Sequence, residues 1–198
     1  MKESSDGTLW LGTYGQGLYA YQRNNNSLRH YLYDANNPSS ISSNIITSIT
    51  EDSHQQIWLT TEGNGFCKLN RDQTFTRYLP SRRFPCEITC AMIEDAKGYL
   101  WITTTKGLIC FNPHTSDYII YKKSDGLTDN HFTYNSRYTD SNGKTYLGCI
   151  NGMIAFNPYE MKTNRYMPDV FITGLTVMGT NKDFSGNGES VLTTKKIS

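Results

Sequence analysis

The chain has 198 residues and a nearly balanced charge, because 19 Lys and Arg stand against 18 Asp and Glu. This balance provides no basic surface for nucleic acid or for an anionic membrane. The sequence also lacks a run of 18 apolar residues and an apolar signal-peptide region after its first methionine. We therefore expect either a cytosolic protein or an internal piece of an exported one.

A short motif occurs four times along the chain, around Trp10, Trp58, Trp101 and Tyr146. The spacings between these aromatic residues are 48, 43 and 45 residues. Several other positions recur in register, among them an aspartate six residues before the aromatic, at Asp52, Asp95 and Asp140. A period of this size is the signature of a repeat protein in which each copy is one structural unit.

Each copy of the repeat predicts four short strands. In the third copy they cover residues 88–94, 99–103, 108–111 and 118–121, which are rich in β-branched and aromatic residues and are separated by turn formers. No window carries the 3.6-residue apolar period of a helix. Four strands in a repeat of about 40 to 50 residues indicate one blade of a β-propeller.

The repeat divides the chain into five segments, which are residues 1–44 (a blade without its inner strand), 45–87, 88–131, 132–167 (a last blade without a clear outer strand) and 168–198. We predict an all-β fold in which a partial β-propeller of about four four-stranded blades forms an open arc. Open strand edges recruit other chains, so we expect self-association. The alternative is a ring of four blades, closed by residues 170–177 pairing with the first blade.

The motif Asp-x-x-Gly-x-Leu-Trp-Ile-x-Thr, followed by Gly-Leu and then Phe-Asn-Pro, resembles the two-component regulator propeller repeat of bacterial hybrid sensor kinases. Residues 151–158 followed by 168–175 are similar to the junction at which the last blade leads into the triple-tyrosine domain of those receptors. The resemblance implies that residues 168–198 begin a C-terminal β-sandwich. It also implies a periplasmic location, glycan sensing, and a histidine kinase outside this chain.

We interpret the chain as a ligand-sensing, and in particular glycan-sensing, fragment of such a receptor. The alternatives are a propeller scaffold or lectin-like module that does not signal and, third, a propeller glycan lyase or hydrolase. No catalytic, cofactor or metal residues are predicted, because the nucleophile, phosphate-loop and zinc motifs are missing. The expected partners are an oligosaccharide, the remaining blades and the sandwich, with no nucleic acid and no membrane contact by this segment.

The candidate ligand-binding residues follow from propeller topology, because turns between second and third strands open on the same face as the connections between blades. These residues are Tyr14, Gln16, Glu62, Asn64, Arg82, Arg83, Lys106, Asp125, Asn130, His131 and Asn151. Aromatic, amide and charged groups at a shallow mouth suit a polar ligand. The competing interpretation is that exposed loops are polar on any face.

Other distinctive residues have structural interpretations. Trp10, Trp58, Trp101 and Tyr146 are expected to pack between blades, and the three motif aspartates to accept backbone N–H bonds in turns. The five cysteines, Cys67, Cys86, Cys90, Cys110 and Cys149, are expected to be small buried hydrophobes. In an oxidising compartment a bridge from Cys86 to Cys90 is the one candidate disulfide.

Overall fold

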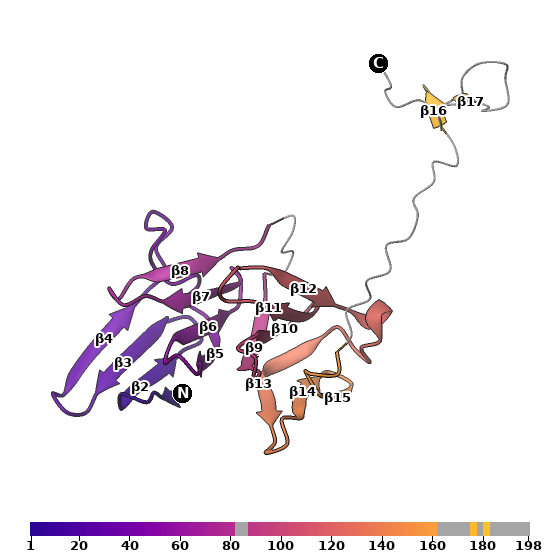
Figure 1. The fold of residues 1–198 in the computed structure, drawn as a ribbon. Helices are drawn as coiled ribbons and strands as arrows, with labels where there is room; N and C mark the ends of the chain where they lie inside the picture. Colours follow the sequence, from indigo (N-terminus) through magenta and orange to yellow (C-terminus); the bar gives the residue numbers. More distant parts are fainter. Residues whose placement is uncertain (82–86, 162–174, 178–179, 183–198) are drawn as a thin grey trace. The chain divides into compact units, whose positions relative to one another are not determined.

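The computed structural model describes residues 1–81, 87–161, 175–177 and 180–182 (Figure 1). The described residues are almost all in strands and turns, with one short 3-10 helix, η1 (Lys123–Asp125). Residues 1–161 form one compact unit and residues 162–198 a second. Within the second, β16 (Leu175–Val177) pairs with β17 (Thr180–Lys182) in an antiparallel hairpin. The remainder of the predicted sandwich segment lies outside the described residues.

Residues 1–161 form four antiparallel sheets, which we call the first to fourth blades. The first blade holds β1 (Lys2–Glu3), β2 (Thr8–Gly12), β3 (Leu18–Gln22) and β4 (Ser27–Tyr31). The second holds β5 (Ile46–Glu51), β6 (Ile57–Thr61), β7 (Phe66–Leu69) and β8 (Phe75–Tyr78). The third holds β9 (Thr89–Glu94), β10 (Leu100–Thr104), β11 (Gly107–Phe111) and β12 (Tyr118–Tyr121). The fourth holds β13 (Phe132–Thr139), β14 (Thr145–Cys149) and β15 (Gly152–Phe156).

The blades follow one another as an open arc of a propeller, as predicted (Figure 1). The first blade differs from expectation, because the two-residue strand β1 occupies the inner position that was predicted to be missing and pairs Lys2 with Trp10. In the described part of the fourth blade no fourth strand is present. The ring alternative is not supported by β16, which pairs with β17, while residues 170–174 lie outside the described residues.

Three hydrophobic clusters join consecutive blades. Trp10 of the first blade packs with residues of the second, Trp58 of the second with residues of the third, and Trp101 of the third with residues of the fourth. These three indoles are only 2–5% exposed. Phe66 of the second blade adds an edge-to-face contact with Phe111 of the third, at 5.2 Å between ring centroids. The core is therefore divided among the interfaces between blades, as nearest-neighbour repeats require.

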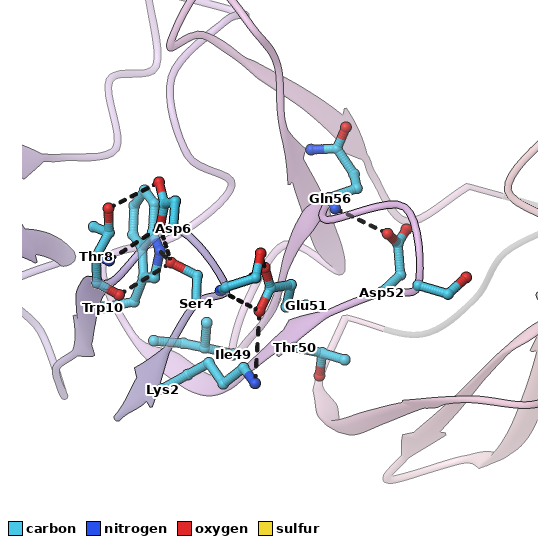
Figure 2. Close-up of polar contacts among 12 residues, drawn as sticks. Lys2, Ser4, Asp6, Thr8, Trp10, Ile49, Thr50, Glu51, Asp52 and Gln56 are labelled. Atoms are coloured by element: carbon cyan, nitrogen blue, oxygen red, sulfur yellow. Dashed lines mark hydrogen bonds and ion pairs between the residues drawn. The ribbon is translucent and has the colours of Figure 1, made fainter.

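The motif aspartate holds both its turn and its aromatic residue. In the third blade, Oδ1 of Asp95 accepts the backbone N–H groups of Lys97 and Tyr99, and Oδ2 accepts the indole N–H of Trp101 at 2.8 Å. The same pattern occurs at Asp52 with Trp58 and at Asp140 with the Tyr146 hydroxyl. In the first blade the Ser4 hydroxyl accepts the Trp10 indole N–H (Figure 2). A buried indole N–H needs such a partner.

In the second and third blades, a glutamate beside the motif aspartate ties the blade to the one before it. Glu51 accepts the backbone N–H and hydroxyl of Ser5, and Glu94 accepts the same two groups of Ser53. Glu51 also lies 3.7 Å from the Lys2 ammonium (Figure 2). The adjacent acids of the second and third copies therefore have separate structural roles, one within the blade and one between blades.

Replacing Trp101 by alanine should lower the free energy of unfolding by about 3 to 5 kcal/mol, because a large-to-small change in a packed core leaves a cavity. The matched control is Tyr99→Ala, two residues away, whose side chain is 36% exposed. Urea denaturation followed by circular dichroism measures both. A Trp101→Ala protein as stable as the Tyr99→Ala protein would contradict the packing role.

Candidate functional site at the mouth of the central channel

The turns between second and third strands lie against the connections between blades, at one end of the strands. The backbone N–H groups of Gly15 and Gly17 donate to the carbonyl of Asn44 at 3.0 and 2.8 Å. Gly63 and Gly65 donate in the same way to the carbonyl of Glu87 at 3.2 and 2.9 Å. These repeated bonds hold turn and connection together, so each blade presents both on the same edge.

Several of the predicted ligand-binding residues already have partners on this edge. Asn130 accepts the backbone N–H of Lys123, and Asp125 accepts that of Lys122. The amide of Asn151 donates to Asp129 at 2.8 Å. These side chains therefore order the loop between the third and fourth blades.

Other predicted residues are more open. Tyr14 is 76% exposed, and its backbone forms a bridge with Ile45. Lys106 and His131 are also exposed, and the Gln16 carbonyl lies 2.8 Å from a ring nitrogen of His30. Asn64 is half-buried. Arg82 and Arg83 lie outside the described residues.

The inner strand of the fourth blade is interrupted by a wide bulge. Phe132 pairs with Cys149 and Arg137 with Leu147, so residues 133–136 lie opposite Gly148 alone. Asn135, inside this segment, has a φ of 50°. Bulges redirect side chains out of the regular ladder. Here Tyr134, inside the bulge, and Arg137, directly after it, both reach the second blade, past the third.

Tyr134 and Glu62 form a polar contact at the loop end of the inner strands. We use the name channel for the side of the arc that the inner strands line, and mouth for its loop end. The Tyr134 hydroxyl donates to Oε2 of Glu62 at 2.8 Å. Burial, and then the bond to Glu62, raise the pKa of Tyr134. Tyr14 lies on the same edge, because its backbone forms a bridge with Ile45, whose carbonyl also accepts the backbone N–H of Glu62 at 3.0 Å. Two tyrosines and one carboxylate, from the first, second and fourth blades, thus meet at this mouth. We call Tyr14, Glu62 and Tyr134 the mouth cluster.

Arg137 crosses the channel below the mouth cluster. Its guanidinium donates to the carbonyl of Ile49 and to Oγ1 of Thr50, both at 3.0 Å, and it also bonds Ser48 and Asn135. Burial lowers the pKa of this guanidinium, which nevertheless keeps its charge at neutral pH. A cavity of about 160 Å³ lies beside it, lined by Lys2 among others. Arg137 therefore links the fourth blade to the second through hydrogen bonds.

The sequence analysis did not identify Tyr134 or Arg137 as site residues. A signal was present, because the inner strand β13 has eight residues, whereas β5 and β9 have six. Extra length in one copy of a repeat indicates an insertion, and in a strand this means a bulge. The direction in which the bulge points is not encoded in that length.

Ser53, His54 and Glu94 lie together but do not have the geometry of a hydrolytic triad. The Ser53 hydroxyl donates to Glu94 at 2.7 Å, and it lies 3.3 Å from Nδ1 of His54. In a triad the carboxylate orients the histidine, and the histidine accepts the serine proton. Here the carboxylate accepts a hydrogen bond from the serine hydroxyl itself. Within the described ranges, no three His, Cys, Asp or Glu side chains are grouped as metal ligands.

The surroundings of the described cysteines indicate that these side chains serve in packing. Cys67, Cys90 and Cys149 are buried, and Cys110 is half-buried. Burial raises the pKa of the Cys67 thiol to about 11 and that of the Cys110 thiol to about 12. Both are therefore protonated and weakly nucleophilic at neutral pH. The suggested bridge from Cys86 to Cys90 involves a residue outside those that the structure describes.

A family model described as two component regulator propeller matches residues 40–63. A curated relative, Histidine kinase P4 of Formosa agariphila, is 26% identical over an alignment of 249 residues that covers 99% of this chain and 18% of the relative. The chain thus spans about a fifth of that relative's length. No helix in the described residues is long and apolar enough to cross a membrane.

Two solved structures show a similar fold. The extracellular domain of a hybrid two-component system from B. thetaiotaomicron matches with a TM-score of 0.72 and 26% identity, over 93% of this chain and 26% of that one. Virginiamycin B lyase from Staphylococcus aureus matches with a TM-score of 0.57 and 14% identity, over 79% of this chain and 54% of the lyase. The lyase shows the fold alone. Together the matches confirm the propeller fold and the resemblance to two-component regulator propellers.

Replacing Arg137 by methionine should lower the free energy of unfolding by about 2 to 3 kcal/mol, because hydrogen bonds to a charged group are lost and their acceptors remain in the channel. Arg23→Met is the control, since Arg23 is exposed on the turn after β3. Thermal unfolding of the two variants gives the comparison. Equal melting temperatures would mean that the hydrogen bonds of Arg137 between the fourth and second blades do not stabilise the fold.

Cys67 and Cys110 should resist alkylation by iodoacetamide at pH 7 in the folded chain and react fully in urea. The stabilisation that comes from keeping the Cys67 thiol neutral is complete below its ordinary pKa of 9.0 and is lost as the pH rises toward about 11. Mass spectrometry of peptides alkylated at pH 7 and pH 10 checks both statements. Rapid modification at pH 7 without unfolding would contradict them.

Proposed function

We propose that residues 1–161, which resemble two-component regulator propellers, form part of the ligand-sensing region of a periplasmic receptor. The observation that carries this proposal is the 26% identity over 93% of the chain to an extracellular domain of a hybrid two-component system. In this proposal the histidine kinase, the other blades and the membrane segment belong to the parent receptor, outside these residues. Residues 168–198 would begin a β-sandwich after the blades at 1–44, 45–87, 88–131 and 132–167.

The proposed ligand is a glycan held at the loop face, with the mouth cluster at its centre. Tyr14 and Tyr134 are 76% and 44% exposed, so their rings are accessible to a ligand. Tyrosine combines an apolar ring with a polar tip, which suits the mixed surface of a sugar. Glu62 supplies a carboxylate acceptor for sugar hydroxyls. Gln16, Lys106, His131 and Asn151 would surround this centre, and Arg82 and Arg83 remain part of the proposal.

The bulged strand β13 offers a route by which a ligand at the mouth changes the arc. Tyr134 and Arg137 belong to the fourth blade, and the groups they bind belong to the second. A ligand that replaces the bond between Tyr134 and Glu62 therefore alters how two non-adjacent blades are held. A ligand shifts an equilibrium only through such differential contacts.

The other functional classes have weaker support. A scaffold or lectin-like propeller would present the same loop face without a signalling partner. A propeller lyase or hydrolase rests on likeness of fold alone, at 14% identity, and fold does not determine function. We therefore retain sensing as the proposal.

A glycan array probed with the 198-residue chain tests it. We expect binding of at least one oligosaccharide class, and at least a tenfold loss of affinity in Tyr14→Ala combined with Glu62→Gln, since the contacts at the mouth are removed. Tyr99→Ala is the control, because this tyrosine stands at the motif turn, at the other end of the strands. Binding that is unchanged in the double variant would remove the loop face as the site, and an array without any bound glycan would contradict glycan sensing.

A further inference from the structure

A second hollow lies between the first and second blades, at the ends of the strands opposite to Tyr14. Its volume is about 460 Å³, within the range of about 300 to 1,000 Å³ for ligand pockets. Trp10, Ala20 and Leu69 contribute apolar surface to it. Figure 2 shows Trp10 with Ser4, Asp6 and Thr8, which also line this hollow. We call it the Trp10 cleft.

A small residue, Ala20, stands beside Trp10 in the cleft. Trp10, Ala20 and Arg29 are directly paired across β2, β3 and β4, so they share the face that looks toward the second blade. In the second blade the residue paired with Trp58 is Lys68, and its ammonium lies 5.7 Å from the Trp58 ring centroid. Ala20 has no such side chain. The space next to Trp10 is therefore left for another molecule.

Donors with no partner surround this space. Arg29 and Arg71 both line the cleft and are exposed, and Gln55 lines it from the turn before β6. Within the described part of the chain, the two guanidinium groups have no hydrogen-bond or ion-pair partner, and the side-chain amide of Gln55 has none either. Each guanidinium can offer a planar pair of N–H groups to a carboxylate or sulfate.

The carboxylates of the cleft are already occupied. Asp6 accepts bonds from the Ser4 hydroxyl and from Thr8, and the Ser4 bond holds the pKa of Asp6 below its ordinary value. Glu51 accepts bonds from Ser5 and lies beside the Lys2 ammonium. The donors that stay available are thus two guanidinium cations and one neutral amide, while these carboxylates are satisfied within the protein.

Gln55 keeps a side chain at a position where the backbone favours glycine. Its φ is 61°, and the same motif position holds Gly7, Gly98 and Gly143 at φ of 80°, 80° and 79°. A residue other than glycine in this region is strained. The strain places an amide on the wall of the cleft, and strained residues of this kind concentrate at functional sites.

We propose that the Trp10 cleft binds an acidic oligosaccharide. Arg29 and Arg71 hold its carboxylate or sulfate groups, and Gln55 bonds a hydroxyl. That the ligand is a carbohydrate rests on the proposed function. That the ligand is negatively charged is inferred from the two guanidinium groups. The site is separate from the loop face.

Isothermal titration of the 198-residue chain tests this, with tetragalacturonate as a carboxylated probe, a chondroitin sulfate tetrasaccharide as a sulfated probe, and cellotetraose as a neutral one. We expect at least one acidic probe to bind and the neutral probe to bind at least tenfold more weakly. Arg71→Ala and Arg29→Ala should each weaken the acidic probe at least tenfold, and Arg23→Ala, an exposed arginine outside the cleft, should leave it unchanged. Raising the salt concentration should also weaken binding.

Gln55→Gly separates binding from folding. This variant should melt at the same or a higher temperature, because glycine relieves the strain, and yet bind the acidic probe several-fold more weakly. The proposal is overturned if neither acidic probe binds, if the neutral probe binds equally well, or if Arg71→Ala behaves as Arg23→Ala does. If a glycan binds but responds only to Tyr14 and Glu62, glycan sensing stands and the cleft proposal fails.

Discussion

The bond from the motif carboxylate to the aromatic side chain six residues later is the constraint on which the arc depends. Asp95 uses one oxygen to hold the turn before β10 and the other to hold the Trp101 indole. Because the polar N–H of the indole is satisfied inside its own blade, the ring can be buried against the next blade without an unpaired donor. Local turn formation and packing between blades are thereby joined in one residue pair.

The adjacent glutamates extend this constraint from one blade to the next. Glu94 reaches back to Ser53 of the second blade. In the fourth copy Thr139 stands where the glutamate would be, and Ala96 stands where its serine partner would be. Both partners change together, which is expected if the pair acts as a unit, because an isolated partner would lose its bond. The fourth blade is held instead by its bulged strand.

The strands were predictable because their signals are local. The predicted strand at 118–121 coincides with β12, and the predicted strand at 108–111 begins one residue after β11 does. The two-residue strand β1 was missed because Lys2 and Glu3 carry no strand pattern of their own. On the loop face, turn and connection residues were predicted from blade topology, but the bonds that already occupy Asn130 and Asn151 were not.

The sequence by itself determined the period, the four-stranded unit, the buried tryptophans and the turn carboxylates, because each depends on residues within one repeat. Tyr146, the aromatic of the fourth copy, is only half-buried. Only the tertiary structure decided that Tyr134 meets Glu62, 72 residues away, and that Arg137 meets Ser48, 89 residues away. Such pairs depend on the curvature summed over several blades, which no local pattern encodes. The same holds for the Trp10 cleft, since its walls come from two blades.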